Sequence, residues 1–307
     1  MAAVAEENDH FAFETIQLNT ASEDREFRRY NDGDEVQRPE IFDDRCRDLL
    51  FMARIERIVH GTEEKGGNPT TLIVFRFRFH GINEQRRFKE AVIDVTFRDE
   101  QKRNEFDPEV IALWPNGDFT LGEPTGIQVE DTRSQEGGVE LGAGASGSDV
   151  RGHIVQKWER RQSYKKTDRS RLTGSICLDM EVRKFGRDNA ICLTMAENAT
   201  TCSGLVTDIY AAVLLRRKDD SNFLATLQIK PKAYFTYNVI RELRQLTPFR
   251  PGNHPVKFVP GVKFLRSETS TGFLEAKLRE EIDQQNLNAI KLDSLAGVLG
   301  TTALVVA

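Results

Sequence analysis

Apolar and polar residues alternate along much of this chain, and such alternation is typical of β-strands with one buried face. The clearest stretch is residues 72–80, whose two faces differ in character: Phe75, Phe77 and Phe79 on one, Arg76, Arg78 and His80 on the other. The same alternation predicts further strands at residues 50–60, 91–97, 110–114, 119–121, 154–164, 175–182, 191–197, 210–216 and 223–235. No helix-length segment separates them. We therefore predict an all-β fold, mainly an antiparallel β-sandwich or two packed sandwich-like sheets.

Turn motifs connect several of these strands. The sequence Pro115-Asn-Gly-Asp118 predicts a tight hairpin between the strands of residues 110–114 and 119–121. Residues 219–222, Asp-Asp-Ser-Asn, predict a turn before the last strand. The region around residues 137–147 is rich in glycine and indicates a flexible surface loop.

Composition suggests three regions along the chain. Residues 1–47 are acidic and mostly poor in apolar groups, so we expect them to be largely disordered, although residues 11–18 alternate like a strand. Residues 48–266 form the predicted β-sandwich body, which contains the Gly-rich loop. Residues 267–307 form a predicted C-terminal helix and an apolar tail. The helix is indicated by three apolar residues at helical spacing: Leu274, Leu278 and Ile282.

Net charge, the share of hydrophobic residues and cysteine spacing exclude several classes of protein. The first 50 residues hold 14 acidic residues and six arginines, a net charge of -8, against -5 for the whole chain. Hydrophobic residues make up 39%, which excludes collagen-like and fully disordered chains. The four cysteines match no zinc spacing, so we expect reduced thiols. We expect no signal peptide, no transmembrane helix and a cytoplasmic location, with the nucleus as the alternative.

Several motifs together resemble a protein group. They are Asp107-Pro-Glu-Val-Ile-Ala-Leu-Trp-Pro-Asn-Gly117, Lys157-Trp158, Leu172-Thr-Gly-Ser-Ile176, Pro255-Val-Lys-Phe-Val-Pro260 and Leu292-Asp-Ser-Leu-Ala-Gly-Val-Leu-Gly-Thr-Thr302. Over residues 48–302 the chain resembles a group of uncharacterised β-rich proteins of filamentous fungi. The resemblance implies a fungal, intracellular protein. It transfers no activity and no site residue.

A basic segment is the first candidate binding element. Residues 157–171 carry seven Lys and Arg and two acidic residues, with Trp158 and Tyr164 between them. Such a segment can contact an anionic partner through its cations: Lys157, Arg160, Arg161, Lys165, Lys166, Arg169 and Arg171. A solvated hairpin tip is the favoured interpretation. The chain's pI of about 5.7 argues against a nucleic-acid partner.

The apolar tail is the second candidate. Residues 294–307 contain no charged side chain. We favour a closing strand or a part of the core. The alternatives are self-association through a sheet edge and insertion at a membrane surface. Self-association would use Leu295, Val298, Leu299, Leu304, Val305 and Val306.

Catalytic and cofactor motifs are weak in this sequence. Residues 142–147 satisfy GxGxxG but lack the strand before and the helix after that a dinucleotide site needs. The five histidines are scattered, and no GxSxG motif occurs. We expect no cofactor and no metal, and we favour a non-enzymatic protein-interaction or scaffold function with a protein partner or self-association. The alternatives are a membrane-active or self-assembling β protein and a hydrolase with paired carboxylates in a groove. The sequence does not identify a small-molecule ligand.

Overall fold

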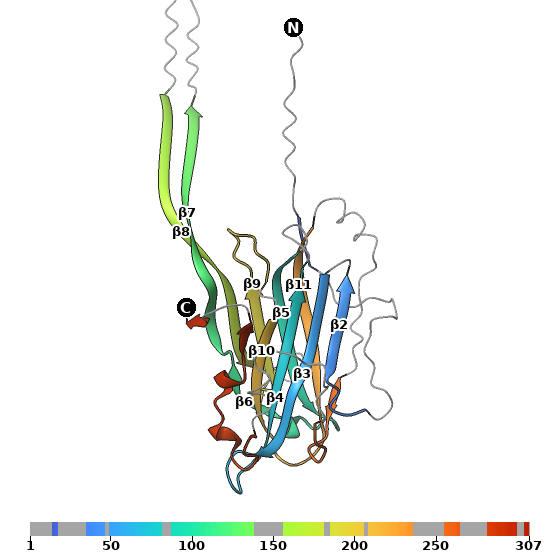
Figure 1. Ribbon diagram of the computed structural model, residues 1–307. Coiled ribbons are helices and arrows are strands. Elements are labelled where there is room, and N and C mark those ends of the chain that lie inside the picture. Colours follow the sequence, from blue (N-terminus) through green and yellow to red (C-terminus); the bar gives the residue numbers. More distant parts are fainter. Residues whose placement is uncertain are drawn as a thin grey trace, which may run out of the picture. The chain divides into compact units, whose positions relative to one another are not determined.

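A computed structural model describes residues 14–17, 35–46, 49–81, 87–137, 156–180, 185–205, 208–235, 255–264, 281–299 and 304–306. Within these ranges the chain is built from strands and short 3-10 turns (Figure 1). None of the described helical turns is long and apolar enough to cross a membrane.

The chain divides into two compact units. Residues 1–122 and 169–307 form the larger unit, and residues 123–168 form the smaller one. Strands β7 (Gly117–Gly137) and β8 (Gln156–Cys177) are neighbours in one sheet, and both run from one unit into the other. The described part of the smaller unit is therefore a ribbon of these two strands.

The first sheet of the larger unit has the order β1-β11-β5-β9-β8-β7-β14, with β12 also paired to β11. Its pairings are antiparallel. Short strands cover parts of its edges: β12 and β1 lie along β11, and β14 lies along β7. The remaining bounds are β1 Glu14–Gln17, β5 Arg87–Asp99, β9 Ala190–Ala196, β11 Phe223–Phe235, β12 Val256–Phe258 and β14 Leu304–Val306.

The second sheet has the order β13-β10-β4-β3-β2, with β6 also paired to β10. Along one edge, β13 and then β6 cover successive parts of β10. Along the other edge, β2 covers only the first part of β3. The strands are β2 Glu40–Cys46, β3 Leu49–Thr62, β4 Pro69–His80, β6 Glu109–Trp114, β10 Asp208–Arg216 and β13 Gly297–Leu299.

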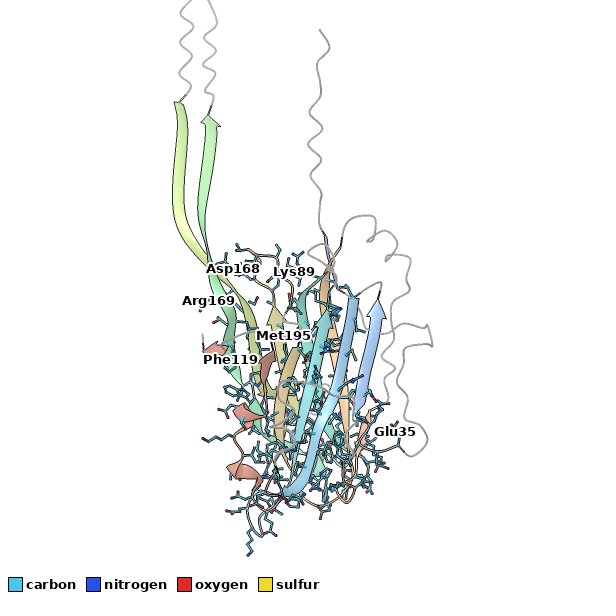
Figure 2. All side chains as sticks on the ribbon, viewed as in Figure 1. Glu35, Lys89, Phe119, Asp168, Arg169 and Met195 are labelled. Carbon is cyan, nitrogen blue, oxygen red and sulfur yellow. The ribbon has the colours of Figure 1, made fainter. Side chains whose placement is uncertain are left out.

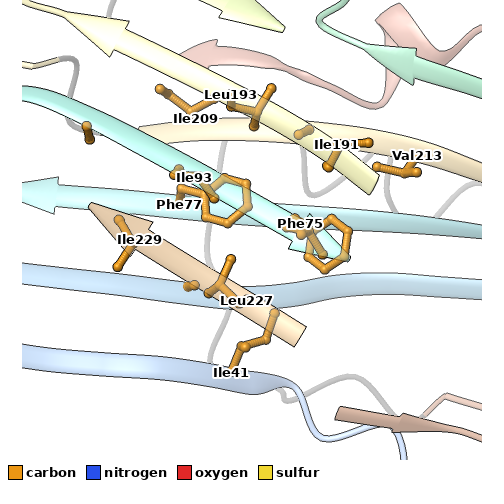
Figure 3. Packing of buried hydrophobic residues seen from close by; sticks show 14 of the residues in the cluster. Ile41, Phe75, Phe77, Ile93, Ile191, Leu193, Ile209, Val213, Leu227 and Ile229 are labelled. Atoms are coloured by element: carbon orange, nitrogen blue, oxygen red, sulfur yellow. The ribbon is translucent and has the colours of Figure 1, made fainter. Parts of the chain in front are cut away.

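The main core lies between the two sheets. Phe75, Phe77 and Phe79 of β4 are at most 1% exposed, which confirms the predicted buried face of that strand. Figure 3 shows side chains of both sheets in this cluster, among them Phe77 from the second sheet and Ile93 from the first. The predicted all-β fold with two packed antiparallel sheets is therefore confirmed.

A second cluster lies on the opposite face of the second sheet. Its members come from β3, β4 and β10 and from the C-terminal segment: Val59, Leu72, Val74, Tyr210, Ala212, Leu214, Leu287, Leu295 and Ala296. The segment of residues 281–296 thus supplies apolar side chains that cover this face, and the 3-10 turns at Leu287–Ala289 and Leu292–Ser294 belong to it.

The structure differs from the sequence predictions at a hairpin, at the C-terminal helix and at strand β2, and it leaves the Gly-rich loop almost untested. Residues 110–114 and 119–121 do not form a hairpin, because β6 pairs with β10 in the second sheet while β7 belongs to the first. The predicted C-terminal helix is not supported: residues 281–286 are irregular, and residues 265–280 lie outside the described residues. Strand β2 lies in the segment of residues 1–47, which the sequence predicted to be largely disordered. The Gly-rich loop at 137–147 falls almost wholly outside the described residues.

Gly174 of β8 provides a test of this packing. A β-carbon at this position would stand 2.0 Å from the carbonyl oxygen of Pro115, a backbone atom that cannot turn away. We expect Gly174→Ala to lower the free energy of unfolding by about 2 kcal/mol, as measured by denaturant titration. Ser175→Ala, at the exposed neighbouring position, is the control and should change stability by less than about 0.5 kcal/mol. Equal stability of the two variants would contradict the contact.

Candidate functional site

Among the residues that the structure describes, the edge of strand β3 has backbone partners at both ends and none at Ile58 and His60 between them. Strand β2 pairs with residues 49–54 of β3, and the N–H of Ile55 donates to the carbonyl oxygen of Pro39 at 2.7 Å. At the other end, the N–H of Thr62 donates to the carbonyl oxygen of Gln284 at 2.8 Å. We call residues 58–60, which lie between these two contacts, the open stretch.

The direction of the backbone groups on this stretch follows from the β3–β4 register. Thr62 lies opposite Pro69, which has no N–H, and the Thr62 N–H points away from β4 to Gln284. Because hydrogen-bonded and non-bonded pairs alternate in an antiparallel ladder, the N–H and C=O groups of Ile58 and His60 also point away from β4. Neither residue has a backbone partner on that side among the described residues.

A cavity of about 1160 Å³ lies along this open stretch. Strand β3 forms one wall, and residues 260–264 and 281–285 form the others. The lining is mixed. Charged groups come from Glu56, Arg57, Lys263, Glu281 and Asp283, and apolar groups from Ile58, Val59, Pro260, Val262, Phe264 and Ile282. Val262 is 40% exposed, so an apolar side chain of the lining is accessible.

A chain of hydrogen bonds ties β3 to the wall of residues 260–264. The Gln37 amide nitrogen donates to the Val262 carbonyl oxygen at 2.9 Å, which leaves the Gln37 amide oxygen to face His60 Nε2 at 2.5 Å. His60 Nε2 must then donate, and Nδ1 accepts from the Thr71 hydroxyl at 2.9 Å. Gln37 is 4% exposed and has a φ of 53°, a conformation that side-chain-bearing residues rarely adopt. His60 is therefore held as a neutral ring at the edge of the cavity.

His60 makes stability depend on pH. Burial, with a further contribution from the charge of Arg217, lowers the pKa of His60 from 6.5 to about 4, while Asp220 acts in the opposite direction. Between pH 4 and pH 6.5 the unfolded chain protonates His60 more readily than the folded chain does. The contribution of neutral His60 to folding stability is therefore fully present above pH 6.5 and is lost as the pH falls toward 4. We expect a loss of at most about 3 kcal/mol, measured by denaturant titrations between pH 7 and 4.

The control for this pH effect is a comparison of two histidine variants. His60→Gln should remove this part of the slope, whereas His80→Gln, at an exposed position, should keep it. A slope that survives in His60→Gln would show that other groups cause it.

A buried ionic cluster lies beside the cavity. Arg76 Nε and Nη2 donate to the two carboxylate oxygens of Asp208 at 2.8 and 2.5 Å, and both side chains are less than 10% exposed. Glu56 lies at the register shift of β3, and its Oε1 is 3.6 Å from Arg76 Nη1. Arg78 also donates a hydrogen bond to the Asp208 carboxylate. The bond to Asp208 raises the pKa of Arg76, and burial raises that of Tyr210 to about 12. The cluster joins β3, β4 and β10 behind the open edge.

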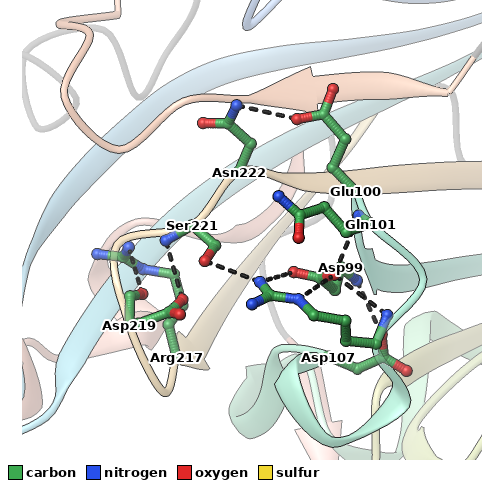
Figure 4. A network of polar contacts seen from close by, with 9 residues as sticks. Asp99, Glu100, Gln101, Asp107, Arg217, Asp219, Ser221 and Asn222 are labelled. Carbon is green, nitrogen blue, oxygen red and sulfur yellow. Dashed lines mark hydrogen bonds and ion pairs between the residues drawn. The ribbon is translucent and has the colours of Figure 1, made fainter.

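A second polar network joins the turn after β5 to the turn between β10 and β11 (Figure 4). Arg103 donates to both carboxylate oxygens of Asp99 and to the Ser221 hydroxyl, and the first of these contacts lowers the pKa of Asp99. The pKa values of Glu100 and Asp219 are lowered too, mainly by hydrogen bonds from Lys257 and Ser221 respectively. This network therefore fixes two turns.

The carboxylates give the hydrolase alternative no support. A second cavity of about 820 Å³ is lined by Glu105, Asp107 and Glu109. Glu109 accepts hydrogen bonds from Arg187 and Arg216 at 2.5 and 3.3 Å. A general acid needs a raised pKa, whereas each described carboxylate with a shifted pKa is lowered. Within the described ranges no cluster of His, Cys, Asp and Glu suits a metal ion.

The predicted basic residues are divided between the two units. Lys157, Arg160, Arg161, Lys165 and Lys166 lie on the part of β8 that belongs to the smaller unit. Arg169 and Arg171 belong to the larger unit. Arg169, which Figure 2 labels, is half-buried and donates to the Thr120 hydroxyl at 3.3 Å, and Arg171 is exposed. An anionic partner for these residues stays a prediction.

The apolar tail lies within both sheets. Leu295 is 4% exposed in the second cluster, and Val298 and Leu299 belong to β13, which pairs with β10. Leu304, Val305 and Val306 form β14, which pairs with Leu121, Thr120 and Phe119 of β7. These positions support the favoured interpretation of the tail as closing strands. Self-association through the tail stays a prediction.

Three cysteines of the larger unit are unpaired. Cys177, Cys192 and Cys202 are free and half-buried. Burial raises the pKa of the Cys192 thiol to about 11, and the same cause raises that of Cys177. Thiols with raised pKa values are poor nucleophiles at neutral pH.

The comparisons with known proteins leave the function open. No protein-family model matches the chain, and no curated protein matches it in sequence. Among solved structures, the NetB toxin of Clostridium perfringens in its membrane-inserted form is similar, with 7% sequence identity and a TM-score of 0.25. The likeness covers 75% of this chain and 93% of the toxin chain. A similarity with so low a TM-score supports no conclusion about the fold or the function of this chain.

The residues of the open edge carry no distinguishing signal in the sequence. Ile58 and His60 occur in a predicted strand, but nothing local distinguishes a covered strand edge from an open one. Gln37 falls in a region predicted to be a loop, and its role depends on contacts with His60 and Val262, which are distant in the sequence.

Proposed function

We propose that this protein is a non-enzymatic binding protein that captures an extended segment of a partner protein as an added strand on the edge of β3. The observation that carries the proposal is the pair of outward-facing backbone groups, on Ile58 and His60, that line the cavity without a partner among the described residues. Strand addition uses such groups for affinity and side-chain pockets for specificity.

The surroundings of the edge support this proposal. The other edges of the second sheet end in the short strands β13, β6 and β2, and short edge strands are one way in which proteins limit unwanted edge pairing. Along β3 the open stretch is bounded by the backbone contacts of Ile55 with Pro39 and of Thr62 with Gln284, so it has room for a short segment and not for a long sheet edge of a second copy. A cytoplasmic location is part of the proposal, and the free cysteines fit a reducing compartment.

Ile58→Pro provides the test on the protein side. Proline removes the Ile58 N–H, which faces the cavity and not β4, so the β3–β4 ladder keeps its hydrogen bonds. Binding is measured by isothermal titration, with twelve-residue peptides selected from a random library on the wild-type chain as the probes. We expect an affinity loss of about tenfold or more, the effect of one or two backbone hydrogen bonds.

The matched control is Ile58→Val, which keeps the N–H and should bind the selected peptides like the wild type. Should Ile58→Pro fail to fold, the same test is made on the peptide by N-methylation of single residues. Alternate residues should then lose binding. Unchanged affinity of Ile58→Pro, or N-methylation effects that do not alternate, would refute strand addition at this edge.

A further inference from the structure

We infer that the partner segment runs antiparallel to β3 and carries, in N-to-C order, a small polar residue, a β-branched aliphatic residue and a second aliphatic residue. These three residues would lie opposite His60, Val59 and Ile58. The inference rests on the proposed function, because it assigns a sequence preference to the same edge. The antiparallel direction follows from β2, which lies antiparallel along the same edge of β3 just before the open stretch.

Val59 determines which side chain fits at the central position of the partner segment. Its own N–H and C=O point toward β4, so an added residue opposite Val59 would form a non-hydrogen-bonded pair, the pair type with the closest side chains. Val59 is 7% exposed and belongs to the second cluster, and Ile282 packs against that cluster and lines the cavity. A β-branched aliphatic side chain fits between these two groups.

The flanking positions lie on the opposite face. Ile58 belongs to the main core, Phe264 packs against that core, and Val262 is partly exposed nearby in the cavity lining. An aliphatic residue opposite Ile58 would therefore meet apolar groups. Both ring nitrogens of His60 already have hydrogen-bond partners, Gln37 and Thr71. The position opposite His60 therefore favours a small residue that needs no hydrogen bond with the ring.

Three synthetic peptides test this preference. The probe is Gly-Ser-Thr-Val-Ile-Ser-Gly with blocked ends, the second peptide replaces its valine by aspartate, and the third reverses the central triplet to Ile-Val-Thr. We expect the probe to bind at least about tenfold more tightly than either of the others, since burying an unpaired carboxylate beside Val59 and Ile282 is unfavourable. Affinities are measured by isothermal titration with the full chain.

A protein variant provides the matched control. Val59→Thr replaces one methyl group by a hydroxyl of similar size, so the preference for valine over aspartate should fall. Two failures are distinguishable. If selected peptides still require the Ile58 N–H but valine and aspartate peptides bind equally, the sequence preference is wrong and strand addition stands. If no peptide's affinity depends on that N–H, the proposed function itself fails.

Discussion

Replacement of Asp208 by alanine is expected to lower the free energy of unfolding by about 3 kcal/mol, because it leaves a buried arginine without its main partner. Arg76 is 8% exposed and donates two hydrogen bonds to the Asp208 carboxylate. The Glu56 carboxylate, whose Oε1 lies 3.6 Å from Arg76 Nη1, compensates only in part for the loss of the Asp208 carboxylate. Denaturant titration at pH 7 measures the effect.

A surface ion pair is the control for this replacement. Lys230 and Asp94 lie 3.7 Å apart, with side chains 52% and 32% exposed, so Asp94→Ala should cost less than about 1 kcal/mol. A similar small loss for Asp208→Ala would contradict the buried cluster. Because Glu56 also lines the cavity, a large loss would show that the region behind the open edge is rigidly held.

Replacement of Phe77 by alanine is expected to cost about 3–5 kcal/mol of unfolding free energy, since it removes a ring from the main core and leaves a cavity. Phe77 is 0% exposed, and its ring lies 6.0 Å from that of Phe75 in a stacked arrangement. Thermal and denaturant unfolding both report the change.

Phe185 is the matched control, because its side chain is 83% exposed. Phe185→Ala should change stability by less than about 0.5 kcal/mol. Two phenylalanine variants with equal effects would contradict the assignment of the core to the faces of the two sheets.

Local periodicity predicted several strands, but it divided β8 (Gln156–Cys177) into two and missed most of β7 (Gly117–Gly137). The predicted strand of residues 223–235 coincides with β11, and the alternation at residues 72–80 correctly placed the phenylalanines in the core. Alternation depends on neighbouring residues alone, so it is visible in the sequence. Arg76 shows where the pattern is insufficient: it lies on the polar face of its strand, yet it is buried because Asp208 and Glu56 neutralise it there.

The pairing of strands was less predictable. The Pro115-Asn-Gly-Asp118 turn suggested a hairpin, but β6 and β7 enter different sheets, and β6 instead pairs with residues about a hundred positions later in the chain. A turn motif fixes the local backbone, whereas partner choice is decided by burial across the whole fold. The open edge of β3 depends on that same choice, which is why Ile58 and His60 carried no signal in the sequence.

Amide hydrogen exchange of the free protein, resolved residue by residue, tests the open edge most directly. The N–H groups of Ile58 and His60, two residues that line the cavity, point away from β4, whereas the N–H of Val59 points into the β3–β4 ladder. The account predicts that Ile58 and His60 exchange on the order of 100-fold faster than Val59, and that a bound peptide slows them. Equally slow exchange at all three residues in the free chain would show that the edge is already covered and would contradict the account.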